Sequence, residues 1–240
     1  RVHDITTSEA SVTLRYAPGE SFVNSKQRRV PVSLDAPIFT LTHAMGFKGV
    51  LGGEYNFNRT EASIWKRFWL PASWGKIDCS VKAGAEWNVV PFPLLILPEA
   101  NLSYITQRET FCLINNMEFL NDRFASMSIS YDMNGKLFNR IPLLKNLKWR
   151  EMFRVRALWG TLTDKNNPFK SSNPDLFRFP TRDGKFTSFV MDPKVPYVEA
   201  SVGIYNIFKL LHVEYVHRFT YRDNPGINKN GIRFMVLMVF

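Results

Sequence analysis

The chain has 240 residues, of which 45% are hydrophobic and 22% are charged, and its formal net charge is +10. No apolar run reaches about 18 residues, which excludes membrane-spanning helices. The mean hydropathy of -0.17 still permits a membrane β-barrel, because only one face of each barrel strand meets lipid. The basic residues are scattered without a zinc-finger, helix-turn-helix or RNA-binding signature, and no nucleic-acid partner is expected.

The chain starts at Arg1 without an initiator Met or the charged and apolar regions of a signal peptide. We therefore expect residues 1–240 to be the C-terminal portion of a longer protein. No linker or internal repeat divides the chain, and a single β-domain of this size is common. The prediction is one domain over residues 1–240.

Apolar and polar residues alternate with period two in many segments, which is typical of β-strands with two different faces. Between Ile77 and Val89 every odd position is apolar, whereas Asp78, Lys82 and Glu86 occupy even positions. The same pattern, of varying strength, is found in Glu9–Tyr16, Val30–Met45, Gly52–Asn58, Glu61–Leu70, Glu109–Phe119, Phe124–Asp132, Trp149–Gly160, Tyr197–Asn206, Leu211–Arg222 and Gly231–Phe240. Helical periodicity is confined to the Leu137–Leu147 connection, so an all-β antiparallel fold is predicted.

The segment from Trp149 to Trp159 is as long as a strand that crosses a bilayer, which needs about 9–11 residues. Its two tryptophans share a face and would stand roughly 25 Å apart along the membrane normal, the height of the apolar band of a barrel. Aromatic residues gather at both borders of that band. We therefore predict a transmembrane β-barrel with an aromatic girdle of Trp149, Trp159, Trp87, Tyr215 and Tyr221.

The opposite face of this segment carries arginines, which water in a lumen tolerates and a packed sandwich core does not. Together with two later arginines they predict a basic patch in the lumen, made of Arg150, Arg154, Arg156, Arg218 and Arg222. An open pore with this patch would favour anions. Neutralisation by Glu199, Glu214 and a plug from the N-terminal part of the longer protein would instead close the barrel, and this closed form is the favoured interpretation.

Short polar stretches predict the turns of the sheet. Asn58-Arg59-Thr60, Asn121-Asp122-Arg123 and Asn206–Lys209 resemble hairpin connections, while Thr161–Pro196 is long and rich in proline. If Phe240 lies at the periplasmic rim, residues 161–196 and 222–230 lie outside the cell. Residues 134–148 and 90–108 are then expected on the periplasmic side.

Residues suited to catalysis or metal binding are few. Cys79 and Cys112 are too few for a disulfide framework and lack metal-ligand spacing with the histidines, so they are interpreted as packing residues. His43 and His217 fall on apolar faces, with no serine assignable beside them. Acidic residues on polar faces are expected to pair across the lumen, namely Glu86, Asp132 and Glu214 with Lys82, Arg154 and Arg218. No catalytic residue, cofactor or metal site is predicted.

The segment Gly231–Phe240 places apolar side chains at alternate positions up to a terminal aromatic. This ending resembles the C-terminal sorting signal of bacterial outer-membrane β-barrels, which the barrel-insertion machinery reads. The resemblance gives this role to Phe234, Val236, Met238 and Phe240. It implies outer-membrane lipid and the insertion machinery as partners.

Runs in the second half of the chain together resemble one family, namely Leu137-Phe138-Asn139-Arg140-Ile141-Pro142-Leu143-Leu144, Leu158-Trp159-Gly160, Pro196–Ile204, and Tyr221-Arg222-Asp223 with Pro225-Gly226. The family comprises outer-membrane proteins of unassigned function, in which a carboxypeptidase-regulatory-like β-sandwich typically precedes a C-terminal barrel. More distantly, the pattern is similar to the superfamily of outer-membrane insertases and two-partner secretion transporters, although its Arg-Gly-Phe or Arg-Gly-Tyr lid motif is lacking. The resemblance implies that residues 1–240 supply about 10–12 strands of a barrel of about sixteen.

These observations predict a non-enzymatic integral barrel in the outer membrane of a Gram-negative type envelope, acting in envelope biogenesis or transport. Envelope proteins are possible further partners. Two alternatives stay open, an outer-membrane hydrolase built on a barrel and a soluble β-sandwich that acts as a binding module.

Overall fold

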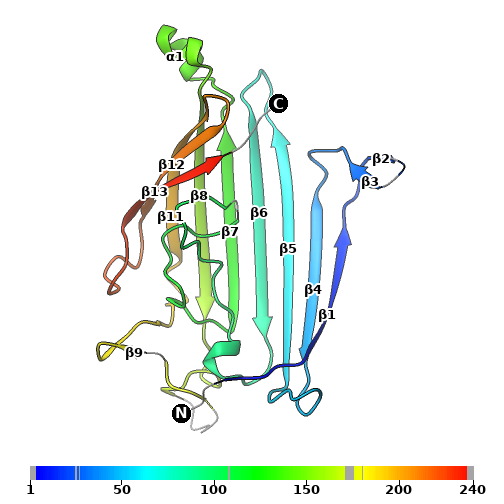
Figure 1. Cartoon of the computed structure of the whole chain (residues 1–240), viewed down its shortest axis with the longest axis vertical. Helices are drawn as coiled ribbons and strands as arrows, with labels where there is room; N and C mark the ends of the chain where they lie inside the picture. The colour runs from blue at the N-terminus through cyan, green and yellow to red at the C-terminus, as the bar shows by residue number, and fades with distance from the viewer. Residues whose placement is uncertain are drawn as a thin grey trace.

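One antiparallel sheet of nine strands dominates the computed structural model, which describes residues 4–24, 26, 28–107, 109–170, 176–179 and 181–236 (Figure 1). In spatial order the strands are β1 (Glu9–Tyr16), β4 (Ile38–Gly46), β5 (Phe57–Trp69), β6 (Lys76–Glu86), β7 (Arg123–Asp132), β8 (Arg150–Thr161), β11 (Tyr197–Ile207), β12 (Leu211–Arg218) and β13 (Asn230–Val236). Each strand of this sheet pairs with the next strand along the chain that belongs to it, as in a meander. The predicted all-β antiparallel fold is confirmed.

Short secondary-structure elements lie in the connections at the ends of the sheet. They are the hairpins β2 (Phe22–Asn24) with β3 (Arg29–Pro31) and β9 (Thr181–Arg182) with β10 (Lys185–Phe186), the 3-10 turns η1 (Phe92–Leu94) and η2 (Phe138–Arg140), and the helix α1 (Pro142–Leu147). The two helical turns η2 and α1 lie where helical periodicity was predicted. Within the described part of the chain, no helix has the length and apolar character needed to cross a membrane.

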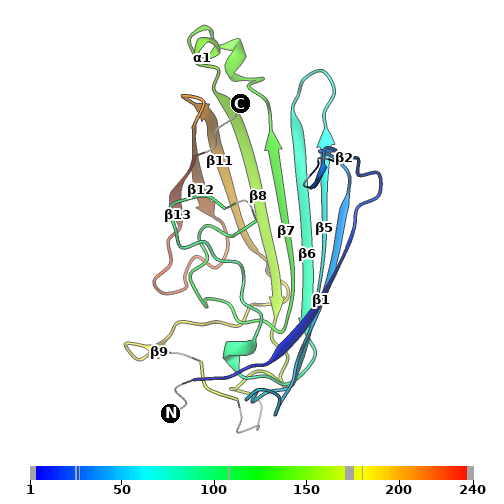
Figure 2. The same cartoon turned by 45° about the vertical axis from the view of Figure 1, so that its right-hand side comes forward.

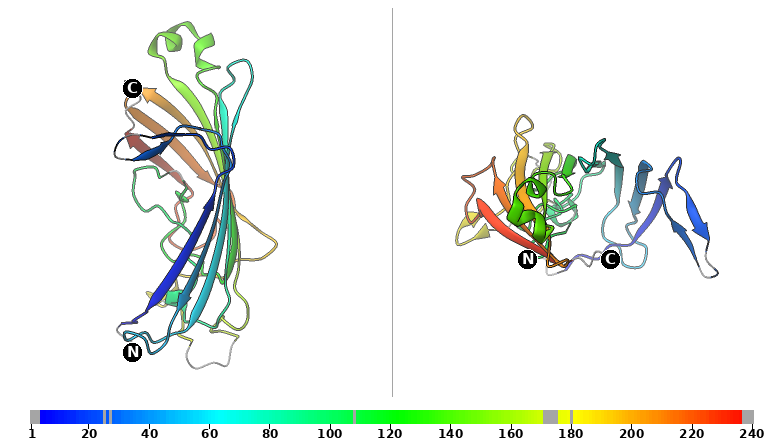
Figure 3. Two further views of the ribbon diagram at one scale, coloured as in Figure 1. Left: turned by 90° about the vertical axis from the view of Figure 1, so that its right-hand side faces the viewer. Right: turned by 90° about the horizontal axis from the view of Figure 1, so that it is seen from above.

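Seen from above, the sheet curves into an open trough (Figure 3). β1 and β13 are its two edges, and among the described residues they do not pair with each other. The sequence predicted about 10–12 strands, because Glu109–Phe119 was counted as a strand and β5 was divided at Asn58–Thr60. The trough therefore has nine strands in its wall and is not closed by the residues described.

The two faces of the trough differ in chemistry. The pairing registers place Lys82, Ser128 and Arg154 on the concave face, and Ala83, Met127 and Val213 on the convex face, as the alternation predicted. The convex face carries large apolar side chains on every strand, and those with the greatest exposure include Val12, Leu14, Phe39, Leu41, Ile64, Phe68, Val81, Phe153, Val155, Trp159, Val202, Tyr215, Ile232 and Phe234. A water-soluble sheet normally shows the reverse arrangement, with its apolar face covered.

Two predicted hairpin turns are wrong. Asn58, Arg59 and Thr60 lie inside β5, because β6 holds this stretch extended: the Asn58 amide donates to the Glu86 carboxylate at 3.2 Å. Asn121-Asp122-Arg123 is the end of a long connection that leads into β7. The predicted turn at Asn206–Lys209 does join β11 to β12, and Asn206, Phe208 and Lys209 adopt positive φ there.

The long connection between β6 and β7, residues 87–122, is here called the internal segment. It leaves the sheet at the lower rim, where the N-terminus lies in Figure 1, and returns through the trough in front of β7 and β8 (Figures 1 and 2). The internal segment thus begins at the rim where β8 and β12 end, opposite to residues 134–148, and its residues 104–106 lie inside the trough beside Phe234. The prediction that placed 90–108 with 134–148 is wrong, because it counted an extra strand at Glu109–Phe119.

The apolar core lies between the internal segment and the concave face of the trough. One cluster joins Phe111, Ile114 and Phe119 of the internal segment to Leu158 of β8 and Tyr197 of β11. A second cluster packs Val90, Leu95 and Leu120 against Phe57, Leu162 and Phe179. Gly160 permits the closest approach of the segment, since a Cβ there would lie 2.2 Å from Asn121 Oδ1.

Candidate functional site

Three buried arginine–glutamate pairs lie on the concave face under the internal segment. Arg154 Nη1 contacts Glu214 at 3.0 Å, and Arg156 Nη1 contacts Glu199 at 2.9 Å. In each of these pairs the side chains are at most 6% exposed. A buried charge without a partner is strongly unfavourable, so each glutamate makes its arginine tolerable in this interior.

The third pair attaches the internal segment to β12. Arg218 meets Glu118 of the segment through two parallel hydrogen bonds of 2.6 and 3.1 Å, a fork geometry that suits guanidinium and carboxylate. The same guanidinium donates to the Leu113 carbonyl at 3.1 Å and lies 4.8 Å from the centre of the Tyr197 ring. The hydrogen bonds of Arg218 thus hold the internal segment at two points, Leu113 and Glu118.

Backbone contacts hold the middle of the segment. The Glu199 carboxylate accepts from the amides of Cys112 at 2.9 Å and Leu113 at 3.1 Å, while Arg233 of β13 donates to the Cys112 carbonyl. The segment also pairs with the edge of β13, where the Thr106 amide donates to the Phe234 carbonyl at 2.6 Å. The segment is therefore anchored to β11, β12 and β13 by charged side chains and by main-chain pairing.

The predicted basic patch is only partly present. Arg150, Arg154, Arg156 and Arg218 do share the concave face, but Arg222 is exposed in the connection between β12 and β13. The three buried arginines are neutralised by glutamates. Two of these, Glu199 and Glu214, were predicted from the sequence. The third is Glu118 of the internal segment, so the neutralising group within the described chain comes from the β6–β7 connection.

Sequence reasoning missed Glu118, because the stretch around it was predicted to be a strand. Met117 has a φ of 58°, which a strand does not allow. The adjacent Asn115 and Asn116 are turn-forming residues, and they are the sequence signal that could have interrupted the predicted strand. Of the acidic and basic residues predicted to pair with each other, Glu214 and Arg154 do so. The others have different partners: Glu86 lies 3.6 Å from Arg59, Asp132 lies 3.7 Å from Lys76, Lys82 contacts Glu61 and Glu99, and Arg218 contacts Glu118.

Cys112 is buried beneath this network, and burial raises the pKa of its thiol. Its sulfur accepts a hydrogen bond from Arg156 Nη1 at 3.4 Å. Cys79 lies in β6 on the convex face, so the two cysteines are on opposite faces of the sheet. The interpretation of both as packing residues agrees with these positions.

A cavity of about 380 Å³ opens on the concave face toward the upper rim, where α1 lies. Its charged lining includes Arg67, Lys76, Asp78, Asp132, Arg150 and Arg154. Arg67 binds both oxygens of Asp78 at 2.6 and 2.9 Å, and Lys76 lies 3.7 Å from Asp132. Asp132 also accepts a hydrogen bond from the Tyr205 hydroxyl.

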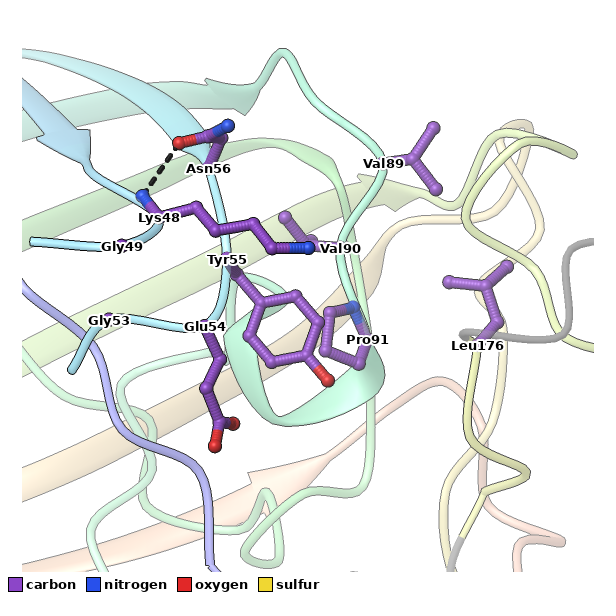
Figure 4. A pocket seen from close by; sticks show the side chains of 10 residues that line it. All are labelled: Lys48, Gly49, Gly53, Glu54, Tyr55, Asn56, Val89, Val90, Pro91 and Leu176. Carbon is purple, nitrogen blue, oxygen red and sulfur yellow. Dashed lines mark hydrogen bonds between the residues drawn. The ribbon is translucent and has the colours of Figure 1, made fainter.

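A second cavity, of about 630 Å³, lies at the lower rim beside the β4–β5 connection (Figure 4). In Figure 4 the Tyr55 ring lies beside Pro91, and Leu176 faces them across the cavity. The Lys48 amide donates to Asn56 Oδ1 at 2.7 Å, which stabilises the loop that forms one wall. Its walls are mainly loop backbone and apolar side chains, so the charged cavity of the sheet is the better candidate for chemical recognition.

Among the described residues, the histidines do not build a catalytic triad. His43 pairs with Thr60 at 2.9 Å, and His217 with Asn230. His212 lies 3.4 Å from Glu214, and Ser201 also bonds to Glu214, so the carboxylate rather than the imidazole stands between the other two groups. A nucleophilic serine would need the imidazole beside its hydroxyl. No group of side chains suited to a metal ion is found among the described residues.

The predicted aromatic girdle and sorting residues fall mainly on the convex face. Trp159 and Tyr215 lie in strands with their side chains outward, and Trp149 directly precedes β8 at its upper end. Trp87 follows β6 at the lower end and donates to the outward-facing Thr60 at 2.9 Å. Tyr221 differs, because its ring packs 5.1 Å from Phe119 of the internal segment. Phe234 and Val236 face outward on β13, whereas Met238 and Phe240 lie outside the described residues.

The chain matches a known protein family. The model of a family described as "Family of unknown function (DUF5686) C-terminal domain" matches residues 2–169, more than half of the chain. No match to the chain was found among curated proteins.

Proposed function

We propose that this chain, which belongs to the DUF5686 family as its C-terminal domain, forms part of a non-enzymatic β-barrel of the bacterial outer membrane. The observation that carries the proposal is the apolar convex face, which extends over all nine strands and stays uncovered. Soluble proteins rarely leave a patch of this extent open to water. An apolar face of this extent is suited to contact with lipid.

Strand length supports the same proposal. β5 to β8 have 13, 11, 10 and 12 residues. Strands of soluble proteins average about 5–6 residues, whereas a tilted strand needs about 9–11 to cross a bilayer. The two shortest connections, residues 70–75 and 208–210, lie at the upper rim, together with the longer connections β1–β4 and β7–β8. The two longest, β6–β7 and β8–β11, lie at the lower rim, and long connections at one rim are typical of outer-membrane barrels.

We further propose that the lumen is closed rather than an open pore. The internal segment crosses the concave face and is fixed there by the Arg218–Glu118 pair and by Glu199. A general diffusion channel needs a water-filled lumen along its whole length. A role in envelope biogenesis or in gated transport therefore fits better, with outer-membrane lipid, the barrel-insertion machinery and envelope proteins as partners. Strands beyond these nine would complete a barrel of about sixteen.

The two alternatives receive less support. A hydrolase lacks a serine beside an imidazole among the described residues, as Ser201 and His212 are separated by Glu214. A soluble β-sandwich would bury the apolar face against a second sheet, and here the single large sheet has its apolar face outward.

The test uses neighbouring residues on opposite faces of β6. In the full-length protein with Cys79 replaced by Ser, the single substitutions Val81→Cys and Ser80→Cys present a thiol on the convex and concave face respectively. We expect membrane-soluble pyrene maleimide to label V81C preferentially in outer-membrane fractions, and a charged water-soluble maleimide to label S80C preferentially.

Fractionation supplies the decisive outcome. The protein should stay in the outer-membrane fraction after a carbonate wash, and unheated samples should migrate faster on detergent gels. A folded monomer that remains in solution without detergent, with V81C open to the charged reagent, would rule out the proposal.

A further inference from the structure

One cation on the wall of the cavity of about 380 Å³, Arg150, has no salt bridge with another described residue. Asp78 is engaged by Arg67, and Asp132 by Lys76 and Tyr205. Within the described part of the chain Arg150 forms no ion pair, and its guanidinium lies 5.9 Å from the centre of the Tyr205 ring. Arg150 thus keeps hydrogen-bond donors free on the cavity wall.

A second guanidinium of the same strand has spare donors. Arg154 uses Nη1 for Glu214, whereas its Nη2 reaches only the Met152 sulfur at 3.7 Å, a weak acceptor. Arg150 and Arg154 are four residues apart on β8, about 13 Å along the strand, and therefore lie on the same face with Met152 between them. Both line the cavity, so two guanidinium groups present N–H donors to the same space.

Hydroxyl groups complete the polar wall. Ser80 of β6 and Ser128 of β7 lie directly opposite each other in the register, and Ser130 is next on the same face. The hydroxyls of Ser80 and Ser128 form no hydrogen bond with other described residues. Side-chain hydroxyls both donate and accept, so they suit a ligand that carries hydroxyls of its own.

We propose that this cavity binds a small polar molecule through a phosphate group held by Arg150 and Arg154, with its hydroxyls against Ser80 and Ser128. Planar guanidinium groups bind phosphate through paired hydrogen bonds, and a cavity of this volume lies at the small end of ligand sites. Glu109 of the internal segment also lines the cavity and is exposed, so it is hydrated at the open side and leaves the arginine wall to the anion. This site goes beyond the membrane proposal, and only the choice of probes and of detergent rests on that proposal.

A phosphate ester with hydroxyls has two sources in an envelope, a soluble sugar phosphate or the headgroup of a phospholipid. Isothermal titration calorimetry on the full-length protein in detergent micelles separates them, with glucose 6-phosphate and sn-glycerol 3-phosphate as probes. Glucose and glycerol are the neutral counterparts. We expect one of the two esters to bind at least about tenfold more tightly than its neutral counterpart, since hydrogen bonds to a charged group are the strong ones.

Substitution at Arg150 tests the site itself. Arg150→Gln should weaken binding of the preferred ester by about tenfold or more. Arg222→Gln, in the exposed β12–β13 connection, should leave it unchanged. Arg150→Lys keeps the charge without the fork and should give intermediate binding. It provides the same test if R150Q does not reach the fast-migrating folded band.

Two results would overturn the proposal. One is that neither ester binds more tightly than its neutral counterpart. The other is that folded R150Q or R150K binds the preferred ester as tightly as the unsubstituted protein.

Discussion

The two ends of the sheet each contain an arginine–glutamate pair, and the two pairs differ in burial. At the β8–β13 end, Arg218 of β12 and Glu118 of the internal segment are 0% and 2% exposed. At the β1 end, Arg15 and Glu20 form an equally well-aligned pair at 2.7 Å, but the Arg15 side chain is 45% exposed, although that of Glu20 is 6% exposed. Geometry is therefore not what separates them. The difference is burial. Removing one partner leaves a buried charge without a counter-charge in the first case, and a charge exposed to water in the second.

The comparison also locates the stable part of the molecule. β8, β11 and β12 have concave side chains covered by the internal segment, whereas every residue of β1 is exposed. Edge strands that lack such cover open at low free-energy cost. We expect unfolding to be resisted by the covered end and to begin at β1.

The largest effect is expected from breaking the buried pair. Glu118→Gln should lower the free energy of unfolding by about 3–5 kcal/mol, because Arg218 then stays buried without its counter-charge. Urea unfolding followed by the loss of the fast-migrating gel band measures this. The double variant Glu118→Leu with Arg218→Met is the control, and it should recover part of the loss because no isolated charge remains. A single variant as stable as the unsubstituted protein would show that water reaches this site.

The next effect distinguishes the two faces of β6. Val81→Arg should destabilise the protein by about 2–4 kcal/mol in a bilayer, where a charge at the middle of a strand meets lipid. Val81 is 44% exposed, so in water the same change would cost little. Ser80→Arg is the matched control, as Ser80 lines the cavity and a long polar side chain has room there. Equal stability of both variants in lipid vesicles would contradict the membrane proposal for β6.

A smaller effect concerns the opening of the internal segment. In a Cys79→Ser background, Cys112 should react slowly with N-ethylmaleimide, because it is 1% exposed and burial raises its thiol pKa. Raising the pH should speed the reaction, since the thiolate is the reactive form. Glu118→Gln should speed it by about tenfold or more at constant pH, because the segment opens more often. Rapid labelling without the substitution would mean that the segment is not held as the contacts indicate.

The smallest effect is expected at the β1 end. Arg15→Gln should leave the midpoint of urea unfolding unchanged within error, because the pair with Glu20 is open to solvent and is screened by salt. Glu20→Gln should behave in the same way. A clear loss of stability in either variant would show that this end is covered by another part of the full-length protein, and would remove the contrast between the two ends.

Much of the fold could be predicted from the sequence, because period-two alternation is a local property. Glu9–Tyr16 was predicted with its bounds as observed, and Trp149–Gly160 within a residue of β8. The outward position of Val213 and the inward position of Arg154 follow from the same pattern, since neighbouring side chains on a strand must point to opposite faces. The sequence by itself thus determined most strands of the sheet and the chemistry of its two faces.

The tertiary structure decided where the irregular residues lie. Asn58 and Thr60 have the composition of a turn, yet they are held extended by hydrogen bonds to β6 and to Trp87. Glu118 becomes the partner of Arg218 although 100 residues separate them, and Arg222, four residues further on, stays outside the trough. No local pattern encodes these outcomes, because the partners are brought together only when the sheet curves and the internal segment packs into it. The physical reason is that alternation fixes which face a side chain takes, whereas pairing of charges depends on contacts between distant parts of the chain.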